Sequence, residues 1–275
     1  MLDKFTHTNS KGETLDFLSL GIFANENELR DYEWSYTTSD ANRIKRFYKG
    51  VVTKTIPFVF YCDENKADEI KNKFYEHFDI DVMTQNKGYF TINDYNLYCY
   101  AYKNTKSTYT TSKQLLNISL DIVTDEAQWI KKTLHSFNFK KSESVGDACK
   151  YTLTYPYIYY DFTNNAVLNN NAFIESNMII RVYGACSSPI IRIGDNIYSV
   201  EDVTLEENEF YEIDTKEKTI YKFDSYGNAT NIFNLRNKKY DCFKPIPIGQ
   251  NVVSVNDAIK LDIMIIEYRS EPRWS

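Results

Sequence analysis

One basic stretch stands out in an otherwise acidic chain. Residues 43–54 contain five basic residues and no acidic one, whereas the whole chain of 275 residues has a net charge of -6. A run of this kind can dock onto an acidic neighbour, and it can equally be a solvated loop. We take Arg43, Lys45, Arg46, Lys49 and Lys54 as a candidate assembly loop.

Alternate tyrosines form a second candidate site at Tyr155, Tyr157 and Tyr159. Residues two apart lie on the same face of a β-strand, and aromatic faces pack well against the apolar faces of sugars. The pattern therefore offers a sugar-stacking platform. The alternative is a strand whose aromatic side chains alternate between core and rim.

Carboxylates gather between residues 206 and 214, at Glu206, Glu207, Glu209, Glu212 and Asp214. Such groups can hold calcium, but they do not have the spacing of an EF-hand. A solvated turn is the favoured interpretation, so we predict no metal site.

Nothing in the sequence indicates an enzyme. The three histidines, His7, His77 and His135, stand in unrelated contexts, and His77 is expected to be a partly exposed helical residue. The sequence contains no HExxH, GxSxG, P-loop or GxGxxG motif. We therefore predict no catalytic residues, no cofactor and a role other than catalysis.

Composition predicts a mainly β protein. Aromatic residues make up 16% of the chain, with 23 Tyr and 17 Phe against 9 Gly, and aromatic residues are enriched in strands.

A polar stretch over residues 140–147 suggests two domains, residues 1–145 and 146–275. One helix is expected after an N-cap at Asp63, because apolar residues at 67, 70, 74 and 78 form a single stripe.

The remaining elements are expected to be strands, with one short exception. In the first domain we predict strands over 29–36 and 116–122, a hairpin over 89–102 that turns at Asn93-Asp94, and a short helix over 125–134 with Trp129 on its inner face. In the second domain about eight short strands indicate a β-sandwich. These strands are expected over residues 151–162, 178–183, 189–193, 197–205, 210–214, 219–223, 252–255 and 259–268.

The five cysteines are scattered and show neither a disulfide framework nor a zinc pattern, which indicates folding in a reducing cytoplasm. The N-terminal residues lack the apolar core of a signal peptide, and no apolar run is long enough to span a membrane. Neither half has the basic footprint of a nucleic-acid-binding protein.

The C-terminal segment Tyr268-Arg-Ser-Glu-Pro-Arg-Trp274 follows an alternating strand pattern. We expect a docked terminus, because Trp274 is too large an apolar group to be left in solvent. The segment resembles the closing motif of the distal tail protein (Dit) family of siphophages that infect Gram-positive bacteria. Other segments are similar to this family in the same order, namely 21–23 with 31–34, 56–78, 116–122 with 128–130, 178–184, 188–193, 210–214 and 246–251.

The resemblance implies a fold and a function. The expected fold is an N-terminal belt domain, a β-sandwich like that of tail-tube proteins with one packed helix, followed by a galectin-like β-sandwich. The expected function is a virion structural hub at the tail tip. Its homohexameric ring would join the tail tube protein to the tail-associated protein and would hold receptor-binding or baseplate proteins. The ring would let DNA pass without specific binding, which suits an acidic chain, and the chain would be made in the host cytoplasm.

Two differences from the family pattern bear on sugar binding and on the belt domain. Family members commonly carry Asp-Pro at the end of the last belt strand, where this chain has Asp125-Glu126-Ala127. Some members carry inserted carbohydrate-binding domains, for which the second half has no room. A carbohydrate-binding module that contacts host cell-wall sugar is kept as the alternative function.

Overall fold

The computed structural model describes residues 5–24, 27–108, 115–140 and 164–274. The chain forms two compact units, and each is described here by itself. The first consists of residues 1–131 with 268–275, and the second of residues 132–267. The expected boundary at residue 145 lies outside the described residues. The observed division comes earlier, because most of strand β10 (Trp129–Asn138) belongs to the second unit.

The first unit contains two antiparallel sheets that share the long strand β8 (Tyr95–Thr108). The beginning of β8 pairs with β7, and its continuation pairs with β9. Strands β1 and β2 extend the first sheet, and β6 and β3 extend the second. The bounds are β1 Phe5–Thr8, β2 Thr14–Asp16, β3 Ile22–Ala24, β6 Val52–Tyr61, β7 Gly88–Ile92 and β9 Leu115–Thr124, with short 3-10 helices at Leu18–Leu20 and Glu28–Arg30.

Two local predictions for this unit are confirmed. The hairpin of β7 and β8 turns at Asn93 and Asp94, whose φ angles of 48° and 67° are those of a type I′ turn. Strand β9 covers the predicted strand, and its alternate residues are buried. Both elements could be predicted because their signal is local.

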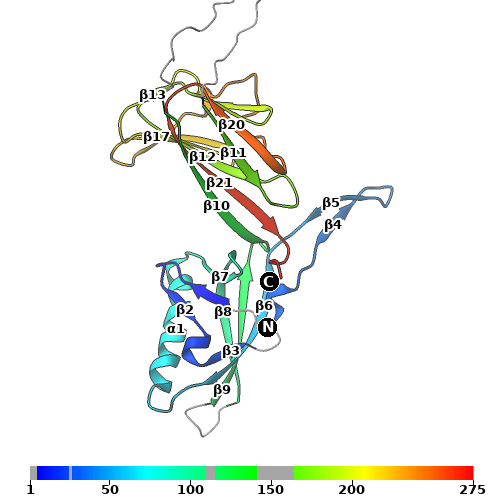
Figure 1. Cartoon of the computed structure of the whole chain (residues 1–275). Coiled ribbons are helices and arrows are strands. Elements are labelled where there is room, and N and C mark those ends of the chain that lie inside the picture. The colour runs from blue at the N-terminus through cyan, green and yellow to red at the C-terminus, as the bar shows by residue number, and fades with distance from the viewer. Residues whose placement is uncertain (1–4, 25–26, 109–114, 141–163, 275) are drawn as a thin grey trace, which may run out of the picture. The chain divides into compact units, whose positions relative to one another are not determined.

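The predicted helix is α1 (Ala67–Thr84), which lies along the sheets of the first unit (Figure 1). Phe74 is fully buried, and its ring centroid lies 5.0 Å from that of Phe60 and 4.9 Å from that of Phe78. The predicted N-cap is wrong. The helix begins after Lys66, and the Asp63 carboxylate instead accepts a hydrogen bond from the Asn65 N–H in the preceding turn.

Two other predictions for this unit are wrong. Residues 29–36 are not one strand, because the Asn27 side chain accepts a hydrogen bond from the Leu29 N–H and caps a 3-10 helix there. Residues 125–134 do not form a helix, because β10 begins at Trp129 and Ile130 pairs with Asn96 of β8. That pairing is a non-local contact, which overrides the local helical pattern.

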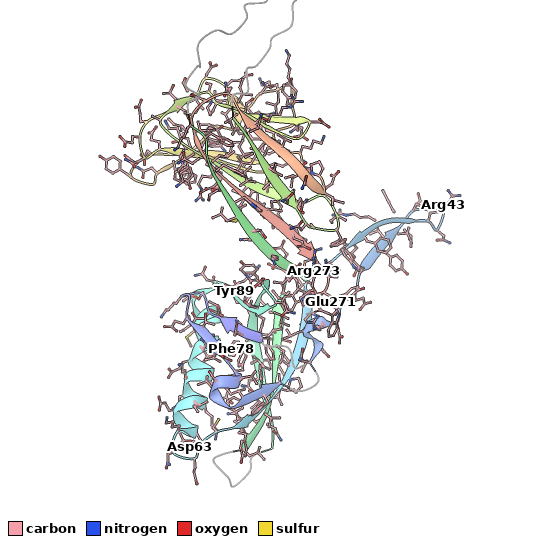
Figure 2. The ribbon with its side chains drawn as sticks, viewed as in Figure 1. Arg43, Asp63, Phe78, Tyr89, Glu271 and Arg273 are labelled. Atoms are coloured by element: carbon pink, nitrogen blue, oxygen red, sulfur yellow. The ribbon has the colours of Figure 1, made fainter. Side chains whose placement is uncertain are left out.

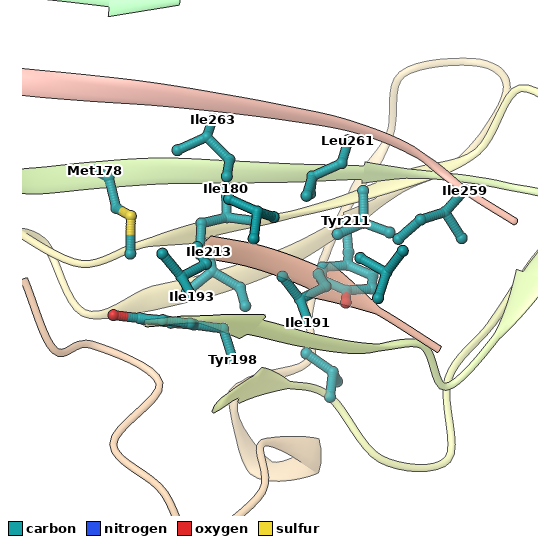
Figure 3. Close-up of a cluster of buried hydrophobic side chains, with 14 of the residues drawn as sticks. Met178, Ile180, Ile191, Ile193, Tyr198, Tyr211, Ile213, Ile259, Leu261 and Ile263 are labelled. Atoms are coloured by element: carbon teal, nitrogen blue, oxygen red, sulfur yellow. The ribbon is translucent and has the colours of Figure 1, made fainter. Parts of the chain in front are cut away.

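The second unit is a sandwich of two antiparallel sheets. One has the order β11-β20-β14-β15, and the other includes β19-β18-β17-β12-β21-β10. Figure 3 shows the core between them, where Ile191 and Tyr198 face Ile180 and Tyr211. The bounds are β11 Asn164–Asn170, β12 Asn177–Tyr183, β13 Cys186–Ser187, β14 Ile190–Ile193, β15 Asn196–Ser199, β16 Thr204–Leu205, β17 Phe210–Asp214, β18 Thr219–Phe223, β19 Ala229–Asn231, β20 Gly249–Val255 and β21 Lys260–Arg269, with a 3-10 helix at Phe233–Leu235.

Most strands predicted for this unit are confirmed, namely β12, β14, β17, β18, β20 and β21. The predicted strand over 197–205 is two strands, β15 and β16, because the chain turns at Asp202 with a φ of 53°. Strands β11, β13 and β19 were not predicted, and the predicted strand over 151–162 lies outside the described residues. The four described cysteines are buried and unbridged.

None of the helices in the described ranges is both long enough and apolar enough to cross a membrane.

Candidate functional site

A two-stranded ribbon, which we call the arm (residues 35–48), carries the exposed half of the basic stretch. Strand β4 (Ser35–Thr38) pairs with β5 (Ile44–Tyr48), and neither pairs with another described strand. Every residue of both strands is exposed, and the arm projects from the rest of the first unit (Figure 1). Figure 2 shows Arg43 at its tip, where the Ser39 N–H donates to the Arg43 carbonyl at 2.8 Å.

Both faces of the arm combine apolar and cationic side chains. Tyr36 pairs across the ribbon with Phe47, and alternation along β5 places Lys45 on the same face. The same alternation places Ile44, Arg46 and Tyr48 together on the opposite face. An assembly contact could therefore use either face.

The exposed apolar side chains of the arm need another explanation than folding of the first unit. Tyr36, Ile44 and Phe47 are 58%, 57% and 55% exposed. A two-stranded hairpin is marginal by itself, and clustered apolar side chains in solvent are typical of a surface that another protein covers. The arm is thus the strongest candidate for an assembly surface in the described part of the chain.

The other two residues of the basic stretch have a different role. Lys54 is buried, and its ammonium donates to the backbone carbonyls of Glu28 (2.8 Å) and Asp31. Lys49 donates to the Ala127 carbonyl at 2.8 Å, and its Nζ lies 4.7 Å from the ring centroid of Trp34. These two lysines hold the root of the arm, whereas Arg43, Lys45 and Arg46 are exposed.

Burial changes the proton affinity of the two root lysines. It lowers the pKa of Lys49 to about 8, with repulsion by Lys54 as a second cause. Burial also lowers the pKa of Lys54, although Asp31 and Glu28 partly offset this effect. The ammonium groups of these two lysines are therefore suited to anchoring the arm within the first unit rather than to contacting another protein.

The C-terminal tail docks onto the first unit through Arg30. The Arg30 Nη1 donates to the Pro272 carbonyl at 2.9 Å and lies 3.3 Å from Glu271 Oε1. The guanidinium carbon lies 3.8 Å from the centroid of the Trp274 ring. The tail is docked as predicted, but the stated reason is wrong. Trp274 remains 73% exposed, so the cation and Pro272 hold the tail, rather than burial of the indole.

Two histidines predicted to be unrelated come together in the core of the first unit. His7 Nδ1 lies 2.9 Å from His77 Nε2, and His7 Nε2 lies 3.8 Å from Asp81 Oδ2. All three side chains are buried, so His77 is not the partly exposed residue that was predicted. The Ser10 N–H donates to Asp81 Oδ1 at 2.6 Å.

The buried histidine pair disfavours a positive charge. Burial lowers the pKa of His7 well below its usual value, and the neighbouring His77 lowers it further. Burial also lowers the pKa of His77, and it raises the pKa of Asp81. An added Cβ on Gly88 would lie 2.2 Å from Asp81 Oδ2, so the backbone closes over the cluster. The arrangement suits a packed polar core rather than a site open to substrate.

Three of the five carboxylates between residues 206 and 214 are engaged by protein groups. Glu209 lies 2.7 Å from Lys222, and Glu212 lies 2.6 Å from Arg181. Asp214 accepts hydrogen bonds from the N–H groups of Lys216 and Glu217. No group of His, Cys, Asp and Glu residues suited to a metal ion occurs among the described residues. The predicted sugar platform, Tyr155, Tyr157 and Tyr159, lies outside those residues.

Comparison with solved structures matches both units together. The chain is similar to the Dit protein of phage SPP1 (gp 19.1), with a TM-score of 0.59 and 9% identity over 96% of this chain and 99% of that one. That protein is described as a paradigm of the hub adsorption apparatus in phages that infect Gram-positive bacteria.

The chain is also similar to a chain of the phage P2 baseplate in its activated conformation with calcium, with a TM-score of 0.58 and 12% identity over 99% of this chain and 100% of that one. For a chain of the strontium form of that baseplate, the TM-score is 0.57 and the sequence identity is 12%. No family model and no curated protein sequence matches. At these identities the likeness concerns the fold: the chain has a mainly β fold like that of a phage distal tail protein, as the sequence resemblance predicted.

Proposed function

We propose that this protein is a structural hub of a phage tail, located at the tail tip of the virion. The observation that carries the proposal is the coverage of the structural match. It extends over 96% of this chain and 99% of the SPP1 Dit protein, so neither chain has a large part without a counterpart in the other. A shared fold does not by itself imply a shared function, so the assembly surface supplies the second argument.

In this proposal the first unit forms a homohexameric ring, and the arm of each copy contacts the next. The arm carries the exposed cations Arg43, Lys45 and Arg46 beside apolar side chains, whereas the whole chain is acidic. A basic, partly apolar ribbon is complementary to the average surface of another copy. Complementary charge favours the rate and the specificity of such an encounter.

The proposed ring stacks between the tail tube protein and the tail-associated protein. The second unit, a two-sheet sandwich that we take to be galectin-like, faces outward and holds receptor-binding or baseplate proteins. The net charge of -6 suits a channel through which DNA slides without specific binding. The role is structural rather than catalytic, and it is supported by the burial of His7, His77 and Asp81, which leaves them closed to a substrate.

The proposal is tested with full-length protein by mass photometry over a range of concentrations. Reversal of Arg43, Lys45 and Arg46 to Glu is expected to weaken assembly by tenfold or more in concentration, on the order of 1.4 kcal/mol per contact. Reversal of Lys11, Lys238 and Lys239, which are also exposed, changes the net charge equally and serves as the control. If both triple variants assemble alike, the arm is not the contact.

A further inference from the structure

A pocket of about 290 Å³ lies in the second unit, at the β15 edge of the four-stranded sheet. Strand parity places it on the side of the sheet that faces away from the core. Tyr198 points into the core beside Ile191 and Ile193 (Figure 3), so its neighbours Ile197 and Ser199 point the other way. The lining residues are Ser188, Ile190, Ile197, Ser199, Val200, Glu201, Asp202, Asn237 and Tyr240.

The walls of the pocket are fixed by backbone hydrogen bonds. The Glu201 N–H donates to the Leu235 carbonyl at 2.7 Å, and the Asn237 N–H donates to the Ser199 carbonyl at 3.1 Å. On the other side, the Ser188 N–H donates to the Val203 carbonyl at 2.7 Å. The pocket is therefore formed before any ligand arrives, which lowers the cost of binding.

Several polar side chains of this pocket make no hydrogen bond within the part of the chain that the structure describes. The Ser199 side chain is only 4% exposed and lines the pocket, yet its hydroxyl makes no hydrogen bond to any described residue. This hydroxyl can therefore donate to, or accept from, a polar ligand or water in the pocket. The carboxylates of Glu201 and Asp202 likewise accept no hydrogen bond within the described ranges.

The lining has two kinds of surface that one ligand must satisfy. Ile190, Ile197 and the ring of Tyr240, which is 39% exposed, provide apolar contact. Glu201, Asp202 and Asn237 provide hydrogen-bond acceptors and one amide donor. Two carboxylates repel an anion, and a simple cation would not use the apolar wall.

We propose that this pocket binds one pyranose unit of a saccharide. A pyranose ring has an apolar face of C–H groups for Tyr240 and a rim of hydroxyls that donate to Glu201 and Asp202. The volume of about 290 Å³ is at the lower end for ligand pockets, which fits a single ring. This site lies in the second unit and does not depend on the arm or on ring assembly.

The test uses full-length protein and the methyl glycosides of glucose, galactose, N-acetylglucosamine and rhamnose, observed by saturation-transfer difference NMR and by titration. At least one glycoside is expected to bind at about 10 mM or below, in the weak range typical of one small ring. Tyr240→Ala and Asp202→Asn are each expected to weaken binding by about tenfold. Tyr226→Ala, an 89% exposed tyrosine of the same unit outside the pocket, is expected to leave binding unchanged.

Thermal unfolding followed by circular dichroism establishes that each variant is folded. The proposal is overturned if no glycoside binds the wild-type protein, if all three variants bind alike, or if only the lysine analogue N-acetyl-lysine methylamide binds. Assembly measured on the same Tyr240→Ala protein separates this result from the proposed function, since ring formation is expected to be unaffected.

Discussion

Replacing Phe74 by alanine is expected to destabilise the first unit by about 3–5 kcal/mol, the usual cost of removing a buried Phe side chain. Phe74 is fully buried, and its ring is surrounded by those of Phe58, Phe60 and Phe78 at centroid distances of 4.9 to 5.4 Å. These contacts attach α1 to the sheets, so the cavity would lie at the centre of the unit. The cost should lie toward the upper end, because packed rings on several sides limit collapse.

The chain provides a probe for this unit alone. It has three tryptophans, Trp34, Trp129 and Trp274, and all belong to the first unit. Tryptophan fluorescence in urea therefore reports the first unit, whereas far-ultraviolet circular dichroism reports both. With a denaturant slope of about 2 kcal/mol per molar, the fluorescence midpoint of Phe74→Ala should fall by roughly 1.5–2.5 M.

The matched control is Met83→Ala in the same helix, because Met83 is 81% exposed. It should change stability by no more than about 0.5 kcal/mol. The reasoning is refuted if Phe74→Ala leaves the fluorescence midpoint unchanged. It is also refuted if the whole dichroism transition moves with the fluorescence, because the two units would then unfold as one.

Three further predictions concern the first unit and use the same fluorescence signal or limited proteolysis. Lowering the pH from 7 to 5 should lower the stability of the unit. The unfolded chain protonates His7 and His77 near pH 6.5, whereas burial keeps both histidines neutral in the folded state. The loss of stability is at most about 1.4 kcal/mol per pH unit for each histidine. Asp81 acts in the opposite sense at lower pH, since its raised pKa lets the folded state take up a proton first. Lys54→Met should cost about 1–3 kcal/mol and speed proteolysis at residues 28–36, because it leaves the carbonyls that Lys54 now binds without a donor. Arg30→Met should release the tail and speed removal of its last residues by carboxypeptidase, with a loss of about 1–2 kcal/mol.

Each of these three has its own contradicting result. A fluorescence midpoint that rises or stays constant between pH 7 and 5 would show that the histidine pair gains protons as easily when folded. Lys45→Met, on the exposed arm, is the control for Lys54→Met, and equal proteolysis of both would place Lys54 outside the anchor. A tail digested at the wild-type rate in Arg30→Met would mean that other contacts hold it.

Local sequence patterns predicted the elements that are determined by residues close to one another in the sequence. The stripe that includes Phe74 and Phe78 predicted α1, and Asn93-Asp94 predicted the turn between β7 and β8. The arm was missed because both of its faces are exposed. Without a buried face, a strand has no alternation to detect.

Contacts between distant residues account for the other errors. His7 and His77 are 70 positions apart, and nothing local predicts that they meet. Lys54 is different, because it alternates with Ile56 and Phe58 along β6, and that parity was a signal that it points inward. The pocket in the second unit combines residues from three separate segments. The strand patterns of β14 and β15 were visible in the sequence, whereas nothing local indicated that the segment with Asn237 and Tyr240 lies beside them.

The most direct test of the central claim is negative-stain electron microscopy of the purified full-length protein at several concentrations, alone and with its tail tube protein. The proposed hub predicts six-fold rings with an open centre, lost in the Arg43, Lys45 and Arg46 to Glu variant. A protein that stays monomeric at every concentration, with and without the tube protein, would contradict it.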